Sequence, residues 1–145
     1  MLNGIILKKL KVIEDKQGKG NIMHVLRRDS EIFTEFGEVY CSFINPGFIK
    51  GWKRHLRQTQ HFAVPVGNID VILYDDRDDS NTKGRREKIS IGKDNYFLLK
   101  IPPMIWYAFK SSKNESAMII NCTDIPHDPD EGQQVDQLEG VSLKF

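Results

Sequence analysis

Short apolar runs separated by turn residues follow one another along most of the chain. Many of these runs alternate between apolar and polar positions, as β-strands do when one face packs in a core. We predict strands at Ile5–Val12, Ile22–Arg27, Glu38–Ile44, Phe48–Leu56, Gln60–Val66, Ile69–Tyr74, Lys88–Ile91, Tyr96–Ile101, Ile105–Lys110 and Ala117–Cys122. The first two are expected to form a hairpin around a turn at Asp15–Gly20, and Ile32–Phe36 to form a strand or one helical turn.

The spacing of these strands predicts an all-β fold. No long helical period and no internal repeat interrupts the series, and turn sequences such as Asn45-Pro46-Gly47 and Gly67-Asn68 separate its members. This pattern favours an antiparallel sandwich or barrel, and a jelly roll of that class encloses a polar pocket between its two sheets. A length of 145 residues suits one domain with its own core, so we expect residues 1–145 to form a single domain.

Composition narrows the classes of partner. The chain has 21 basic and 20 acidic residues, a net charge of +1, which argues against general electrostatic binding to nucleic acid or to a membrane surface. No apolar stretch is long enough for a membrane span or for the core of a signal peptide. Two cysteines, Cys41 and Cys122, lie in strand-like runs and are expected to be buried thiols in a reducing compartment. We therefore predict a cytoplasmic protein.

Two charged segments interrupt the strand pattern. Asp75–Glu87 is rich in turn residues and is expected to be solvated; its aspartates lack the glycine and the terminal glutamate of a calcium loop. Pro126–Glu139 is acidic and without a period, and Val141–Phe145 is a candidate for a last short strand. We expect the tail formed by residues 126–145 to pack on or near the pocket.

The stretch from Gly51 to Gly67 is the strongest candidate for a functional region. It places cationic, imidazole and amide side chains directly before an apolar strand, and buried polar groups need partners or a ligand. Lys53 and His55 are two residues apart, so on a strand they face the same side. Pointing inward, they are suited to abstract a proton beside a carbonyl or to hold a phosphate. Pointing outward, they are solvated charges on an edge strand.

A second candidate region follows the prolines Pro102-Pro103. Trp106 and Tyr107 face opposite sides of the predicted strand, so one of them is expected to line the pocket, with Tyr107 as a proton donor or a packing residue. A metal site is not expected, because the sequence contains no His-x-His pair and His55 and His61 are six residues apart.

From Gly47 to Glu131 the sequence is similar to the dTDP-4-dehydrorhamnose 3,5-epimerase family, cupin jelly rolls that act on nucleotide-linked 4-keto-6-deoxysugars. The matching motifs are Ile49-Lys50-Gly51-Trp52-Lys53, Val66-Gly67, Asp75-x-Arg77-x-x-Ser80-x-Thr82-x-Gly84, Asn95, Ile101-Pro102, Phe109, Thr123-Asp124 and Asp128-Pro129-Asp130-Glu131. The N-terminal positions Arg28 and Phe33-x-Glu35 also resemble that family's substrate-contacting segment. The resemblance implies a cupin double-stranded β-helix.

The resemblance also implies chemistry that needs no cofactor or metal: a histidine removes the proton beside the C4 keto group, and a tyrosine returns one on the other face. The family's arginine falls on Lys50, its catalytic histidine on Lys53, its tyrosine near Ile120 and a second histidine on Tyr107. The family's own acid–base pair is therefore not in place. A reassigned pair, with His55 or Lys53 as base and Tyr107 as acid, remains chemically sensible.

Carried over in this way, the resemblance implies an isomerase or epimerase of deoxysugar and surface-polysaccharide biosynthesis, with a nucleotide sugar as its partner. Two alternatives stay open, a non-catalytic cupin that binds sugar nucleotides and a 3,4-ketoisomerase. The expected substrate-binding residues are Arg28, Glu35, Lys50, Gln60, Trp106 and Tyr40, with Lys50 and Arg28 on the diphosphate and an aromatic ring stacked on the base or sugar. The resemblance further implies a homodimer, for which Ile5–Val12 is a candidate for exchange between subunits.

Overall fold

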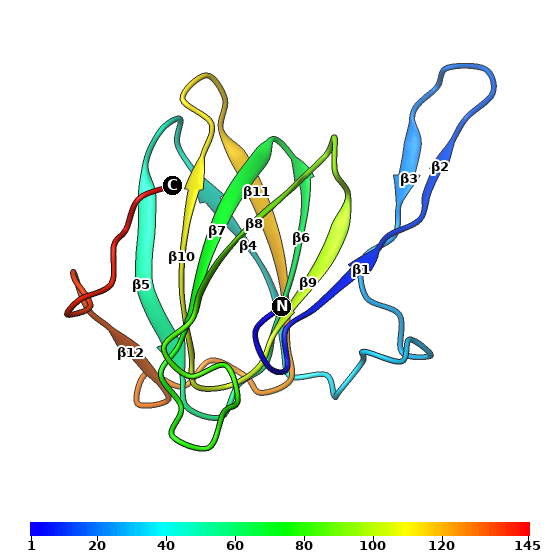
Figure 1. The fold of residues 1–145 in the computed structure, drawn as a ribbon. Helices are drawn as coiled ribbons and strands as arrows, with labels where there is room; N and C mark the ends of the chain where they lie inside the picture. The colour runs from blue at the N-terminus through cyan, green and yellow to red at the C-terminus, as the bar shows by residue number, and fades with distance from the viewer.

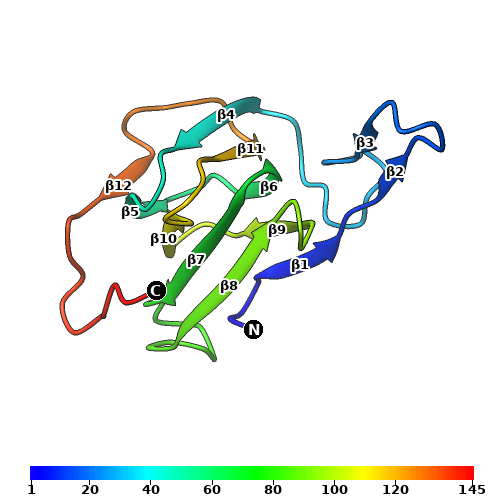
Figure 2. The same cartoon turned by 90° about the horizontal axis from the view of Figure 1, so that it is seen from above.

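Two antiparallel five-stranded sheets face each other in the computed structural model, which describes all 145 residues (Figures 1 and 2). The sheet that we call the β6 sheet runs in the order β1 (Ile6–Lys9), β9 (Phe97–Ile101), β6 (Gln60–Val66), β11 (Ala117–Thr123) and β4 (Glu38–Ile44). The β10 sheet runs in the order β12 (Gly132–Gln134), β5 (Ile49–His55), β10 (Ile105–Ser111), β7 (Asn68–Asp75) and β8 (Arg86–Gly92). The predicted all-β, antiparallel jelly roll is confirmed.

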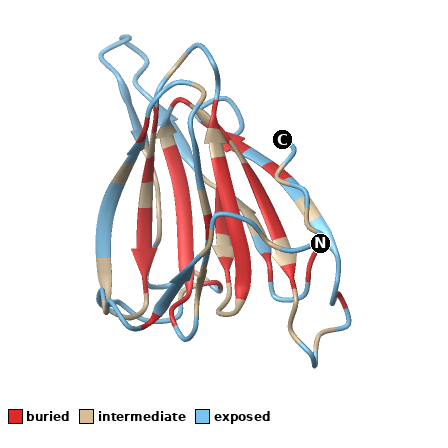
Figure 3. Cartoon of the chain, turned by 90° about the vertical axis from the view of Figure 1, so that its left-hand side faces the viewer, coloured by how far each residue is buried: buried red, intermediate tan, exposed pale blue.

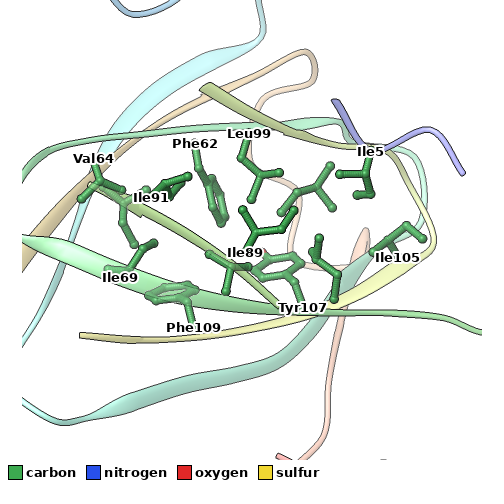
Figure 4. Close-up of a cluster of buried hydrophobic side chains, with 14 of the residues drawn as sticks. Ile5, Phe62, Val64, Ile69, Ile89, Ile91, Leu99, Ile105, Tyr107 and Phe109 are labelled. Carbon is green, nitrogen blue, oxygen red and sulfur yellow. The ribbon is translucent and has the colours of Figure 1, made fainter. Parts of the chain in front are cut away.

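Alternating side chains of both sheets fill the space between them. Figure 4 shows Phe62 and Val64 of β6 facing Tyr107 and Phe109 of β10 within this cluster. The Phe62 ring meets the Tyr107 ring edge-on at 5.5 Å between centroids and the Phe109 ring at 6.0 Å. Each buried aromatic ring contributes about 2 kcal/mol or more through the area it removes from water. The core occupies most of the sandwich, and the buried residues run along the central strands (Figure 3).

The C-terminal residues cross the outer face of the β10 sheet. Trp52, Ile72, Trp106 and Ala108 form a buried cluster on that face, and the tail residues packed against it are Val135, Leu138, Val141, Leu143 and Phe145. The expected strand at Val141–Phe145 is wrong; this segment makes only a single bridge, between Leu138 and Val141. Its apolar side chains serve as a cover for the tryptophans instead of pairing with a sheet edge.

The N-terminal segment differs from the predicted hairpin. Strand β1 pairs with β9 along the sheet edge, because Ile5 and Leu7 join the core there. A separate two-stranded hairpin, β2 (Val12–Glu14) and β3 (Asn21–Met23), projects from the body (Figure 1). The predicted hairpin around Asp15–Gly20 is confirmed, but it is shorter than expected, and the first part of the predicted strand Ile5–Val12 pairs with β9 instead. The segment 32–36, expected as a strand or helical turn, forms turns and irregular chain across the β6 sheet, with Ile32 buried against it.

The first residue of the segment expected to be solvated, Asp75, is a buried carboxylate at the end of β7, and the loop that follows β7 folds around it. Asp75 is 0% exposed and accepts hydrogen bonds from the Arg77 guanidinium at 2.8 and 2.9 Å, from Ser80 Oγ at 2.6 Å and from Thr82 Oγ1 at 2.6 Å. Burial alone would raise the pKa of Asp75, but these donors hold it well below its usual value. Arg77 and Thr82 also bind the backbone of Asn3, so the loop fastens the N-terminus to the body.

Both cysteines are free thiols, as the sequence predicted, but only Cys122 is buried. Cys41 is exposed, because it lies on the outward face of the edge strand β4. The structure contains no helix that is long and apolar enough to cross a membrane.

Candidate active site

Strand β5 delivers the polar side chains of the candidate site. Trp52 and Arg54 take its outer face, where the Arg54 guanidinium lies 4.5 Å over the Trp106 ring and pairs with Asp76 at 3.1 Å. Lys53 and His55 take the inner face, which lines the hollow between the sheets. Because β5 lies between β12 and β10, side chains from three strands meet on this face.

Register places the neighbours of Lys53 and His55. Lys53 pairs across the ladder with Tyr107 of β10 on one side and with Gln134 of β12 on the other. His55 pairs with Gly132, one residue after Glu131. Opposed residues in an antiparallel ladder share a face of the sheet, so Lys53, His55 and Tyr107 converge.

Gly51 allows the close approach of β5 to β10. Its φ of +132° is unfavourable for residues with a side chain, and a Cβ there would lie 2.5 Å from the Ala108 Cβ and 2.6 Å from its Cα. The register between the two strands shifts at this place, between Tyr107 and Phe109. A glycine is therefore needed for Lys53 to sit opposite Tyr107.

A chain of three hydrogen-bonded side chains forms the centre of the site. His55 Nδ1 lies 2.6 Å from Glu131 Oε2, and His55 Nε2 lies 3.2 Å from the Tyr107 hydroxyl. The imidazole and phenol rings are nearly parallel, at 14° between planes. This arrangement links a buried carboxylate to an imidazole and a phenol, and the imidazole and the phenol line two adjoining hollows.

Glu131 is held as a carboxylate although it is only 3% exposed. Its Oε1 accepts hydrogen bonds from the backbone N–H groups of Arg57 and Gln58, both at 2.8 Å. Burial alone would raise the pKa of Glu131, but the two N–H groups and the His55 ring hold it below its usual value. An ionised carboxylate only accepts hydrogen bonds, so His55 Nδ1 is the donor in the His55–Glu131 bond.

With Nδ1 as the donor, the hydrogen-bonding role of His55 Nε2 follows from its partner, Tyr107. Burial, with smaller contributions from Tyr40 and Glu131, raises the pKa of Tyr107 far above its usual value, so the phenol keeps its proton. In neutral His55 the unprotonated Nε2 then accepts the hydrogen bond from the Tyr107 O–H. The result is a base, His55 Nε2, beside a proton donor, Tyr107, with Glu131 as orienting group.

Two adjoining hollows lie beside this chain of residues. The inner hollow, of about 420 Å³, is half apolar and its lining includes Phe62, Tyr107, Phe109, Ile119, Lys50 and Asn121. The outer hollow, of about 550 Å³, is polar and its lining includes Glu38, His55, Gln58, His127, Asp128 and Gln133. Tyr40, Lys53 and Gln134 line both hollows, so these three residues mark the junction.

The cations around the junction differ in their partners. Lys50 donates from Nζ to the Phe43 carbonyl oxygen at 2.5 Å and to Ser42 Oγ at 3.2 Å, which ties it to β4 across the hollow. His55 is hydrogen-bonded to Glu131, whereas the exposed Lys53 ammonium has no hydrogen-bond or ion-pair partner in the protein. Lys53 is thus a free cation at the point where the two hollows meet.

An amide network forms the opposite wall. The Asn121 amide donates to the Tyr40 hydroxyl at 2.8 Å and to Gln60 Oε1 at 2.5 Å, and the Gln60 amide donates to Gln58 Oε1 at 2.6 Å. Gln58, Gln60 and Asn121 are all buried. Gln60 is therefore a support for Tyr40 within the wall, and Tyr40, whose pKa burial raises, is the group that faces the hollow.

Besides Gln60, which lines neither hollow, three other residues that the sequence suggested for substrate binding lie outside the hollows. Trp106 is on the outer face of β10, with its indole N–H donating to Asp76 Oδ2 at 2.9 Å, so it cannot stack on a ligand between the sheets. Arg28 is exposed beside Arg27 on the N-terminal segment, and Glu35 is exposed on the segment that leads to β4. The structure brings together Lys50, Lys53, His55, Tyr107 and Tyr40, and leaves these three apart.

Sequence reasoning missed Glu131 as a site residue. Its motif, Asp128-Pro129-Asp130-Glu131, enters the sequence argument only as a family motif within an acidic tail. The turn that follows β11 returns Glu131 to β5, where the N–H groups of Arg57 and Gln58 donate to it. Two features of the sequence could have indicated this role. Glu131 follows the turn at Pro129, and the candidate base His55 had no predicted carboxylate to orient it.

Comparison with known proteins assigns the chain to a family. The family model described as "FdtA: WxcM-like, C-terminal" matches residues 3–134. The "Probable low-salt glycan biosynthesis epimerase Agl13" of Haloferax volcanii is 34% identical over 122 residues, which are 83% of this chain and 77% of that protein.

Solved structures show the same relationship. A dTDP sugar isomerase from Desulfovibrio desulfuricans G20 has a TM-score of 0.90 and 45% identity, over 94% of this chain and 88% of that one. The dTDP-4-dehydrorhamnose 3,5-epimerase from Sulfolobus tokodaii has a TM-score of 0.80 and 25% identity, over 92% of this chain and 77% of that one. The predicted relationship to the epimerases is confirmed, and the protein belongs to the WxcM-like C-terminal (FdtA) family of sugar isomerase-type cupins.

Proposed function

We propose that this protein is an enzyme that isomerises a dTDP-linked 4-keto-6-deoxyhexose by moving a proton between neighbouring carbons, in the synthesis of a glycan or polysaccharide. His55 is the base that removes the proton beside the keto group, Glu131 orients it, and Tyr107 donates or relays a proton from the same wall. The single observation that supports this assignment is the hydrogen-bonded series Glu131–His55–Tyr107, in which His55 lines the outer hollow and Tyr107 lines the inner one. No step of this reaction requires a metal or an organic cofactor.

The separation of base and acid favours isomerisation over epimerisation. Inversion at a carbon needs a base on one face of the sugar ring and an acid on the other, each roughly 3 Å from the carbon and therefore roughly 6 Å apart. His55 Nε2 and the Tyr107 hydroxyl are 3.2 Å apart and hydrogen-bonded, so a sugar ring cannot lie between them. A pair on one wall is suited to take a proton from one carbon and to return it to the next on the same face. This reaction converts a 4-ketone into a 3-ketone.

The walls suit the rest of such a substrate. The apolar rings of Phe62 and Phe109 in the inner hollow suit a 6-deoxy sugar, which lacks one hydroxyl group. Lys50 and Lys53 supply positive charge for a diphosphate or for a developing oxyanion. Names of relatives point to the same class of substrate, a dTDP sugar.

Proton labelling tests the proposal. The protein is incubated with a dTDP-4-keto-6-deoxyhexose in D₂O, and both product and recovered substrate are examined by NMR. We expect deuterium at C4 of a 3-keto product and at C3 of recovered substrate. Binding of the nucleotide sugar without label or product would contradict the proposal and leave a binding module.

A second candidate function, epimerisation, has one observation in its favour. Tyr40 lies on β4 in the opposite sheet and lines both hollows, so it is a phenol on the far side of a bound sugar. An epimerase that uses His55 and Tyr40 gives deuterium at C3, or at C3 and C5, with inverted configuration and an unmoved ketone. The same NMR spectrum distinguishes this outcome from isomerisation.

We also propose that the enzyme is a cytoplasmic homodimer. Strand β4 is a sheet edge whose outward residues Val39 and Phe43 are exposed, and the β2–β3 hairpin extends from the body with Ile22 exposed. Isolated hairpins and open edges with apolar side chains are stabilised by pairing. Light scattering at micromolar concentration should give twice the chain mass of 16.7 kDa, and a monomer would contradict the dimer.

A further inference from the structure

Lys53 stands where the proposed reaction develops charge. It is two residues from His55 on the same face of β5 and pairs across the ladder with Tyr107. Lys53 therefore lies beside both members of the acid–base pair. It lines both hollows, and its ammonium has no partner in the fold, whereas its neighbour Arg54 is paired with Asp76. Lys53 is exposed to the hollows, so its ammonium is solvated in the free protein and is available to an anionic group of a ligand.

The proposed reaction creates such a partner. When His55 takes the proton from C3, the C3–H electron pair forms the C3=C4 bond and the C4=O π pair moves onto the oxygen as an oxyanion. Completion of the 3-ketone then requires one proton to reach O4 and one proton to leave O3, besides the proton that His55 returns to C4. Tyr107 relays protons to and from His55, and Glu131 orients the His55 ring, so the proton transfer between the two oxygens needs a further group.

We infer that Lys53 binds the enediolate and transfers protons between its two oxygens. The ammonium donates a hydrogen bond to the O4 oxyanion, gives it one proton, and regains one from the O3 hydroxyl, so lysine ends the cycle in its original state. This role rests on the proposed isomerase function. It differs from a role as the carbon base, which belongs to His55, and from a role in holding the diphosphate.

Two substitutions separate charge from proton transfer. Arginine keeps a positive charge but does not release a proton in proteins, whereas methionine keeps most of the length without charge. Lys53→Arg is expected to retain C3–H exchange in recovered substrate within about tenfold while losing formation of the 3-keto product. Lys53→Met is expected to lose both, by about 100-fold or more, as when an oxyanion donor is removed. Thermal unfolding serves as a folding control, because Lys53 has no partner within the fold.

Affinity for dTDP alone supplies the second measurement. If Lys53 contacts the sugar, calorimetry should show the same dTDP affinity in wild type and Lys53→Met within about threefold. A large loss of dTDP affinity would assign Lys53 to the diphosphate and overturn the inference. Product formation by Lys53→Arg at the wild-type rate would show that Lys53 does not transfer protons between the oxygens. C3–H exchange by Lys53→Met at the wild-type rate would show that Lys53 does not stabilise the oxyanion.

The same assays distinguish failure of the proposed function. If wild-type protein forms no labelled 3-ketone, the isomerase assignment fails, and the role of Lys53 fails with it. If wild type is active and the two Lys53 variants behave like it, only the inference about Lys53 fails.

Discussion

Two buried carboxylates, Asp75 and Glu131, show how similar burial serves different purposes. Asp75 is 0% exposed and Glu131 is 3% exposed, and each has a pKa held below its usual value by hydrogen-bond donors. The side-chain donors to Asp75 come from within seven residues, Arg77, Ser80 and Thr82, and all of them are fixed in one loop. Asp75 is therefore a saturated structural centre.

One of the hydrogen-bond donors to Glu131 is a side chain of the candidate site. Two of its partners are backbone N–H groups, but the third is the His55 ring, which lines the outer hollow. Burial and a lowered pKa therefore do not by themselves mark an active site. A titratable partner that reaches both the carboxylate and a cavity does.

The largest effect is expected at His55. Substitution of His55→Ala removes the base and should lower kcat by about 10,000-fold, the upper range for a general base. The ring is partly exposed and makes two side-chain hydrogen bonds, so the fold should survive. Steady-state kinetics with a dTDP-4-keto-6-deoxyhexose and circular dichroism check this; unchanged turnover would remove His55 from the mechanism.

Glu131→Gln tests the orienting role. The amide introduced by this substitution faces the imidazole as a donor, so His55 Nδ1 becomes the acceptor and Nε2 carries the proton. Because that tautomer cannot act as a base at Nε2, kcat should fall by about 1,000-fold while the dTDP affinity stays near the wild-type value. Equal losses of turnover and dTDP affinity would indicate that Glu131 only shapes the pocket.

Asp75→Asn is the matched control on the other carboxylate. It removes the charge that Arg77 pairs with and one acceptor for Ser80 and Thr82, which should lower the free energy of unfolding by about 3 kcal/mol. Urea unfolding measures the loss. Turnover per folded molecule should stay within about twofold, and a large drop in turnover would give the loop a part in catalysis.

Acid should destabilise the protein largely through Asp75. Its folded pKa lies below the unfolded value of about 3.9, so its contribution to stability is complete above that pH and is lost as the pH falls towards the folded pKa. The fold should therefore lose stability below about pH 4 in wild type, and less steeply in Asp75→Asn. Parallel acid-unfolding curves for the two proteins would contradict the assignment.

The strand pattern was predictable, because alternation with a period of two fixes which residues face inward. That period also placed Lys53 and His55 on one face and Trp106 and Tyr107 on opposite faces. It could not say which of the two aromatic residues faces the hollow. That choice depends on the cover of the outer face, which comes from Val135, Leu138 and other distant residues of the tail.

Contacts made through turns, or between residues far apart in the sequence, could not be predicted from the sequence. Glu131 reaches His55 only through the turn after β11, and Asp75 is buried only through side-chain bonds within its loop. Neither arrangement follows from periodicity or composition. The N-terminal hairpin was predicted at its observed turn but with too long a first strand, because local pattern could not show that β1 pairs with β9.

Proton transfer by one base on one face of the sugar can be tested with a substrate that carries deuterium at C3. In a single turnover in ordinary water, His55 should take the deuteron from C3 and return part of it to C4, so the 3-keto product retains label at C4. A product with inverted configuration at C3, carrying hydrogen from solvent and an unmoved ketone, would contradict the account.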